Sequence, residues 1–191
     1  MRTRIVAIGL ALVVGAALVA GAAEVLKSGP QVGDSLGAFT VVKAAGAPHD
    51  GVALGEELCY RCRMGNRPMV LIFAHKTDSA LADLVKQVDG VVAKNADKKM
   101  GSFVSLLGDK PNDLKAEATK FIAASGVEHV AVVVPEEQPN GPKDYNLDSS
   151  ADVTVLIYRQ GTVVANHALP AGGLTAAAIK SIVADTSKIL E

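Results

Sequence analysis

The sequence predicts an α/β fold, a three-layer sandwich in which a mixed central sheet has flanking helices. Two observations lead to this prediction. Predicted strands and helices alternate between residues 69 and 134, which requires right-handed crossovers and a parallel core. Two further apolar runs then follow each other around the short turn Arg159-Gln160-Gly161, and they predict an antiparallel hairpin at the edge of the sheet.

The first elements are separated by glycine- and proline-containing segments. A short strand is predicted at 39–43, and the next strand is the unbroken apolar run Met69–Ala74. Because such a run is typical of a strand that is buried on both faces, we expect it in a central parallel position. Thr77, Asp78 and Ser79 then offer an N-cap for a helix at 80–95, where apolar residues recur at helical spacing.

The second half of the chain supplies the remaining elements. Gly126 suits a left-handed C-cap and should end the second amphipathic helix. The predicted order is a strand at 102–107, a helix at 113–125, a buried strand at Val130–Val134, hairpin strands at 152–158 and 162–168, and a final helix at 175–190.

The N-terminal 23 residues have the pattern of an export signal. The positively charged start, Met-Arg-Thr-Arg, is followed by an uncharged run at 5–23 that contains the small-residue cleavage pattern Ala20-Gly21-Ala22. The run is also long enough for an uncleaved membrane anchor. We therefore expect a signal peptide or anchor at 1–23, a lead-in at 24–37 and one domain at 38–191. Export would place the cysteines in an oxidising compartment, periplasmic or extracellular.

The amino-acid composition limits the classes of binding partner that we expect. The formal net charge is −1 and aromatic residues make up 4% of the chain, with no basic block, so nucleic acid is not expected as a partner. Membrane contact is expected only if the N-terminal segment stays uncleaved. We predict no cofactor.

Cys59 and Cys62 are the only cysteines and lie in the segment Cys-Tyr-Arg-Cys. Two cysteines at this spacing can close and reopen a small disulfide: the first thiolate attacks, and the second resolves the mixed disulfide. A fixed disulfide is an alternative, although so short a loop removes little unfolded-state entropy. A metal site is a third possibility, for which His49 and His75 are the nearest additional ligands.

Charged residues surround the pair. Arg61 and Arg63 could stabilise a thiolate and lower its pKa, or they could be ordinary solvated arginines. By analogy with the usual order in such pairs, we expect Cys59 to be the nucleophile and Cys62 the resolving thiol. His75 follows the central strand and is a candidate accessory base or ligand, although a partly exposed histidine at such a position is more commonly a bystander.

The element order together with the CxxC pair resembles the thioredoxin-like superfamily. The nearest branch is the peroxiredoxin-like proteins of the alkyl hydroperoxide reductase/thiol-specific antioxidant type. Residues 32–40 are similar to the N-terminal motif of that branch, in which Val-Gly-Asp precedes a strand that contains Phe. Residues 144–164 are similar to its C-terminal motif, in which a tyrosine is followed by a strand, a turn glycine and a second strand. The resemblance covers about residues 30–190 and implies the same fold.

The sequence departs from this family at two positions. The family's reactive cysteine follows the first central strand, but residues 74–79 contain none, which argues against peroxidase activity. The cis-proline that thioredoxins carry before the final hairpin is also missing, because Ser150, Ala151 and Asp152 occupy that position. The CxxC pair lies before the central strand instead, and the sequence leaves open which end of the sheet it occupies.

These observations favour an exported thiol–disulfide oxidoreductase that acts on protein or small-molecule thiols and disulfides. The main alternative is a non-catalytic thioredoxin-like binding or scaffold module in which the disulfide is structural. A metal-binding module is the third hypothesis.

Overall fold

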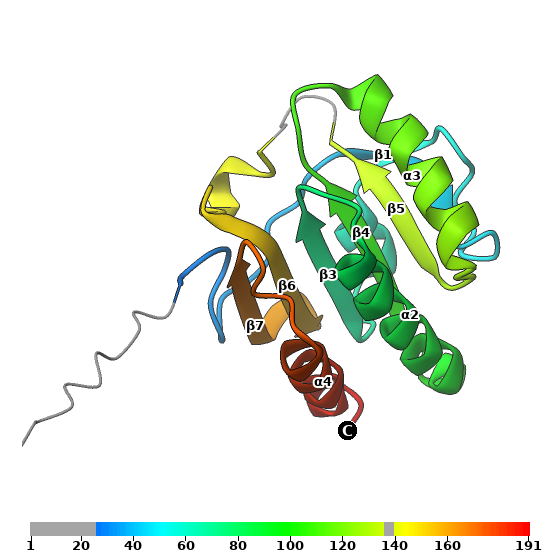
Figure 1. Cartoon of the computed structure of the whole chain (residues 1–191). Helices are drawn as coiled ribbons and strands as arrows, with labels where there is room; N and C mark the ends of the chain where they lie inside the picture. Colours follow the sequence, from blue (N-terminus) through cyan, green and yellow to red (C-terminus); the bar gives the residue numbers. More distant parts are fainter. Residues whose placement is uncertain (1–25, 136–139) are drawn as a thin grey trace, which may run out of the picture.

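A seven-stranded mixed sheet forms the centre of the molecule (Figure 1). The computed structural model describes residues 26–135 and 140–191, so the predicted export signal lies outside the described residues. The strands are β1 (Val41–Gly46), β2 (Glu57–Leu58), β3 (Met69–Ala74), β4 (Gly101–Leu106), β5 (Val130–Val134), β6 (Ala151–Arg159) and β7 (Thr162–Pro170). Their order across the sheet is β2-β1-β5-β4-β3-β6-β7.

The middle of the sheet is parallel and its margins are antiparallel. β3, β4 and β5 pair in parallel, whereas β1 runs antiparallel to β5, and β6 runs antiparallel to β3. Every residue of β3 and β5 is buried. The predictions that these two strands lie in the interior of the sheet, and that β6 and β7 form a hairpin, are therefore confirmed.

The helices are α1 (Tyr60–Met64), α2 (Ser79–Lys94), α3 (Pro111–Ser125) and α4 (Ala176–Asp185). Asp78 is the N-cap of α2, and Gly126 ends α3 in the left-handed conformation, as predicted. The final helix is shorter than expected, because its last turn, Thr186–Ile189, is a 3₁₀ helix. The short elements β2 and α1 had not been predicted.

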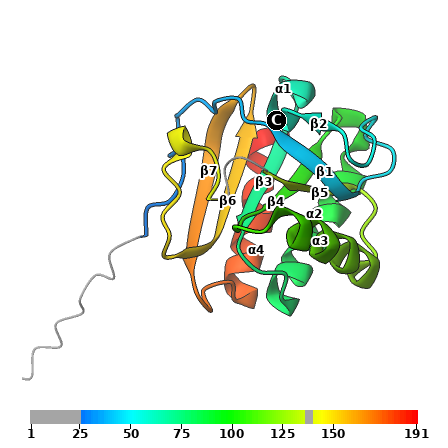
Figure 2. The same cartoon turned by 90° about the horizontal axis from the view of Figure 1, so that it is seen from above.

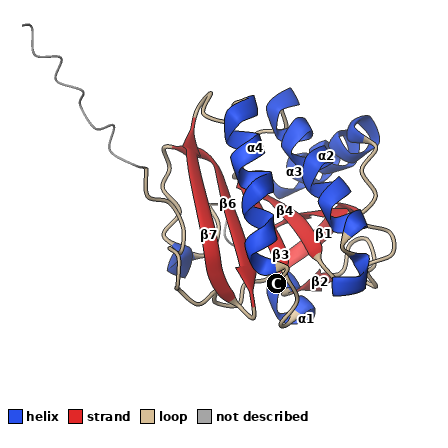
Figure 3. Cartoon of the chain, turned by 90° about the horizontal axis from the view of Figure 1, so that it is seen from below, coloured by secondary structure: helices blue, strands red, loops and turns tan. Residues whose placement is uncertain are grey.

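The two faces of the sheet are covered differently, and alternate side chains of each strand pack against different layers. Val70, Ile72 and Ala74 of β3 pack in the core beneath α2, α3 and α4. Met69 and the other alternate residues of β3 pack against α1, the segment that contains Leu36 and Phe39, and the 3₁₀ helix Lys143–Tyr145. Figures 2 and 3 show α1 on the opposite side of the sheet from the three longer helices. The three-layer sandwich is confirmed, and one outer layer consists of short and extended segments.

Part of the predicted lead-in covers the outer edge of β7. Ser35 forms a bridge with Thr162, and the Gly33 N–H donates to the Val163 carbonyl at 2.9 Å. This pairing satisfies backbone groups that an exposed edge strand would otherwise present to another chain. Within the described part of the chain, no helix has the length and apolar character needed to cross a membrane.

Candidate functional site

Cys59 and Cys62 form a disulfide at the start of α1. Their Cα atoms lie 5.2 Å apart. Cys59 is the N-cap residue, and its Sγ accepts a hydrogen bond of 3.1 Å from the backbone N–H of Cys62. Cys62 is exposed and Cys59 is half-buried. The sulfur pair is therefore open to solvent on the Cys62 side.

The helix that carries the pair is short because of the residues at its two ends. At the start, Leu58 of β2 pairs with Val41 and fixes the backbone in an extended conformation. At the end, Gly65 has a φ of 60°, and its N–H donates to the carbonyls of Arg61 and Cys62. Five residues are too few to give a recognisable helical period, so the sequence did not reveal α1.

The buried face of α1 settles which end of the sheet holds the pair. The Tyr60 ring stacks on Phe103 of β4, with centroids 5.1 Å apart. Met64 lies four residues later on the same helical face and borders a cavity together with Met69, the first residue of β3. The disulfide thus lies near the amino ends of β3 and β4, on the face that lacks the long helices, and its cysteines point away from the core.

His75 lies at the other end of β3. Its N–H donates to the Asp152 carbonyl at 3.2 Å. A six-residue strand spans roughly 17 Å, so the structure does not bring His75 to the cysteine pair. Burial lowers the pKa of His75, and the charge of Asp152 opposes this shift. Among the described residues, no group of three or more His, Cys, Asp or Glu side chains is arranged to hold a metal ion.

Arg61 packs against the turn between β6 and β7. A Cβ atom at Gly161 would overlap the guanidinium of Arg61, so a larger residue at this position would displace the Arg61 side chain. The Arg61 Nε is buried, with no hydrogen-bond partner among the described residues. Burial raises the pKa of Tyr145 and of Tyr158, and the positive charge of Arg61 opposes both shifts. Arg61 is thus directed partly into the aromatic core.

Arg63 is more exposed than Arg61 and contacts a different segment. Its Nη2 donates to the Gly51 carbonyl at 2.9 Å. Arg63 is therefore hydrogen-bonded, and Arg61 packed, against segments other than the cysteine pair. Their predicted effect on a Cys59 thiolate stays a prediction.

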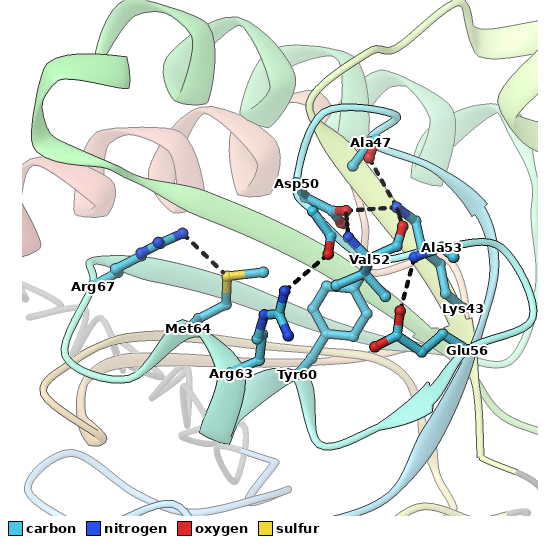
Figure 4. A network of polar contacts seen from close by, with 11 residues as sticks. Lys43, Ala47, Asp50, Val52, Ala53, Glu56, Tyr60, Arg63, Met64 and Arg67 are labelled. Atoms are coloured by element: carbon cyan, nitrogen blue, oxygen red, sulfur yellow. Dashed lines mark hydrogen bonds and ion pairs between the residues drawn. The ribbon is translucent and has the colours of Figure 1, made fainter.

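A buried polar network meets α1 from the loop after β1 (Figure 4). The Lys43 Nζ and an Asp50 carboxylate oxygen are 2.7 Å apart, and the other oxygen of this carboxylate accepts a hydrogen bond of 2.6 Å from the Tyr60 hydroxyl. Sequence reasoning missed this network. Lys43 within an apolar strand was the only signal, and nothing local indicated Asp50 as its partner.

A cavity of about 430 Å³ lies beside the buried face of α1. Its apolar part includes Met64, Met69 and Met100, and charged residues such as Arg67 and Lys99 border it. Tyr60 and Met64 line the cavity, whereas Cys59 and Cys62 do not. It therefore adjoins the helix that carries the disulfide, while the sulfur atoms face solvent elsewhere.

Comparison with known proteins identifies the fold. No protein-family model matches the chain, and no curated protein matches it by sequence. Similar solved structures include a candidate thiol:disulfide interchange protein DsbE from Chlorobium tepidum, with 18% identity, a TM-score of 0.61, and coverage of 84% of this chain and 99% of that one. A candidate protein disulfide isomerase from Bacteroides thetaiotaomicron has 13% identity, a TM-score of 0.61 and coverage of 86% and 94%.

A peroxidoxin, BcpB from Mycobacterium tuberculosis, is also similar. It has 11% identity, a TM-score of 0.56, and coverage of 84% of this chain and 99% of that one. At these identities the likeness concerns the fold. The chain has the thioredoxin-like fold that the sequence predicted, with a CxxC disulfide displaced to the segment before β3.

Proposed function

We propose that this protein is an exported thiol–disulfide oxidoreductase that uses Cys59 and Cys62. The observation that carries the proposal is a surface disulfide on a thioredoxin-like fold, with one sulfur-bearing residue exposed. Two structurally similar proteins are described as a disulfide interchange protein and a disulfide isomerase, which is consistent with this chemistry. Export rests on the sequence pattern of residues 1–23.

The proposed reaction is a two-step exchange with a substrate dithiol. A substrate thiolate attacks one sulfur of the disulfide, the S–S bond breaks, and the other cysteine leaves as a thiolate. The second substrate thiolate then attacks the substrate sulfur in the mixed disulfide, which oxidises the substrate and leaves Cys59 and Cys62 reduced. In the reverse direction, the Cys59 thiolate attacks a substrate disulfide and Cys62 resolves the intermediate. The substrates are protein or small-molecule thiols and disulfides.

The second candidate function is a non-catalytic binding or scaffold module with a structural disulfide. One observation favours it: the pair lies near the amino end of β3, whereas residues 74–79, where the resembled family carries its reactive cysteine, contain none. For the same reason we expect little or no hydroperoxide turnover.

A redox titration separates the two candidates. The folded, full-length protein is equilibrated with mixtures of reduced and oxidised glutathione, and with mixtures of reduced and oxidised dithiothreitol for lower potentials, and free thiols are counted by mass after alkylation. A catalytic pair should have a potential between roughly −270 and −120 mV, whereas a structural disulfide should lie below about −300 mV. Cys62→Ser should accumulate mixed disulfides at Cys59, and Cys59→Ser provides the matched comparison. If the disulfide can be reduced only after the protein is unfolded, the proposed oxidoreductase function is excluded.

The same reduced protein tests the proposed role of the arginines. If Arg61 and Arg63 stabilise the thiolate, replacing both with Gln should raise the pKa of the Cys59 thiol and slow its alkylation near neutral pH. Arg67→Gln removes one positive charge beyond the end of α1 and serves as the control for each of the single variants Arg61→Gln and Arg63→Gln. Equal alkylation profiles for the wild type and all of these variants would show that Arg61 and Arg63 do not stabilise the thiolate.

A further inference from the structure

A buried lysine in β1 is held in a complete set of polar contacts. The Lys43 side chain is 1% exposed. Its Nζ lies 2.7 Å from the Asp50 carboxylate and donates to the carbonyls of Ala47 and Val52 at 2.9 and 2.8 Å. An ammonium group has three donors, so all three are used. The loop at 47–52 is thereby tied to the edge of the sheet.

Stability alone is a poor explanation for this ion pair. Two charges lose hydration on burial, and replacing such a pair with apolar residues is often neutral or stabilising. The Asp50 carboxylate also has contacts beyond Lys43: Oδ1 accepts from the Val52 N–H at 2.9 Å, and Oδ2 accepts from the Tyr60 hydroxyl at 2.6 Å. The pair therefore presents a fixed acceptor to the residue that follows Cys59.

Tyr60 is immobilised at both ends of its side chain. The residue is 1% exposed, its ring stacks on Phe103, and its hydroxyl is bonded to Asp50 (Figure 4). A hydrogen bond to a charged acceptor is stronger than one between neutral groups. Because Tyr60 lies between the two cysteines, fixing it restricts the backbone that determines their separation.

Two further contacts restrict the same five-residue helix. Arg61, the other residue between the cysteines, packs against Gly161 of the β6–β7 turn. Arg63 donates to the carbonyl of Gly51, the neighbour of Asp50. The helix therefore packs against the hairpin on one side and is hydrogen-bonded on the other side to the loop that Lys43 and Asp50 hold in place.

We propose that Lys43 and Asp50 are positioning residues for the redox pair. Acting through Tyr60, they keep Cys59 and Cys62 at disulfide distance after reduction as well as before it. Two thiols that cannot separate have a high effective concentration for one another, which favours the disulfide and lowers its reduction potential. This inference rests on the proposed function, because it concerns the potential at which the pair exchanges electrons.

Tyr60→Phe is the sharpest test, because it removes the hydroxyl and keeps the ring that stacks on Phe103. The reduced variant gains freedom that the oxidised variant, held by its disulfide, does not gain. We expect the equilibrium between the protein and the redox buffer to shift about tenfold towards the reduced protein. This shift corresponds to a rise of about 30 mV in the reduction potential of the Cys59–Cys62 pair, a two-electron couple. The melting temperature should fall more in the oxidised protein than in the reduced protein.

Tyr145→Phe is the matched control. Its hydroxyl is buried in the same core cluster and donates to the Gly37 carbonyl at 2.9 Å, but that contact does not involve the loop at 47–52. This variant should lose stability equally in both oxidation states and keep the wild-type potential. Equal potentials for wild type, Tyr60→Phe and Tyr145→Phe would overturn the positioning role and show that the network is only structural.

The outcome is separable from that of the proposed function. A wild-type potential below about −300 mV would exclude the oxidoreductase, yet a selective rise in Tyr60→Phe would still support the positioning role. A wild-type potential in the exchange range with no change in Tyr60→Phe would leave the oxidoreductase intact and remove the positioning role. Asp50→Asn, if it folds, should raise the potential in the same direction, because it weakens the acceptor for Tyr60.

Discussion

Tyr60 and Met64 point towards the core, which leaves Cys59 and Cys62 on the outer side of α1. The residues on either side of the pair thus determine both its exposure and its attachment to the sheet. The sequence identified the cysteines and their charged neighbours. Arg61 and Arg63 contact residues in other loops, so only the structure reveals these contacts.

At the same scale, His75 should make the stability of the protein depend on pH. Burial lowers its pKa in the folded state below the value of about 6.5 that it has when unfolded. The unfolded chain therefore binds a proton more readily, and stability is lost as the pH falls below about 6.5 towards the folded-state pKa. We expect His75→Asn to show a smaller loss between pH 7 and pH 5, measured by urea unfolding.

The exposed residue His49 gives the control for this measurement. His49→Asn should reproduce the wild-type pH profile. A His75→Asn profile parallel to that of the wild type would show that other groups cause the acid sensitivity.

At the scale of elements, the strongest sequence patterns correspond to the most regular parts of the structure. The unbroken apolar runs of β3 and β5 became interior strands, and the helical spacing at 80–95 became α2. β2 has two residues and α1 has five, so both are too short for the strand or the helix periodicity to be recognised in the sequence. Their conformations depend on pairing with β1 and on packing against β4.

The N-cap of α2 gives a prediction at this scale. The Asp78 Oδ1 accepts a hydrogen bond of 2.9 Å from the Leu81 N–H, which would otherwise lack a helical partner. Asp78→Ala should lower the free energy of unfolding by about 1 kcal/mol. Asp83→Ala, at an exposed position within the same helix, should change it by less than about 0.5 kcal/mol. Similar losses for the two variants in urea unfolding would contradict the capping role.

For the whole molecule, the disulfide should contribute little to stability. The two cysteines are only three positions apart, and closing so short a loop removes about 2 kcal/mol of unfolded-state entropy at most. Neither cysteine belongs to the two hydrophobic core clusters that pack against the faces of the sheet. We expect Cys59→Ser/Cys62→Ser to remain folded and to lose no more than about 2 kcal/mol in urea unfolding. A loss above about 4 kcal/mol would indicate that the disulfide is structural.

Taken by itself, the sequence determined the fold class, the interior strands, the hairpin, the long helices and the two cysteines. These follow from periodicity, apolar runs and caps, which act over a few neighbouring residues. Only the tertiary structure decided which end of the sheet carries the disulfide, and that Lys43, Asp50 and Tyr60 meet beneath it. The physical reason is that a buried charge is stable only beside a partner, and the chain's path through space, rather than its local pattern, supplies that partner.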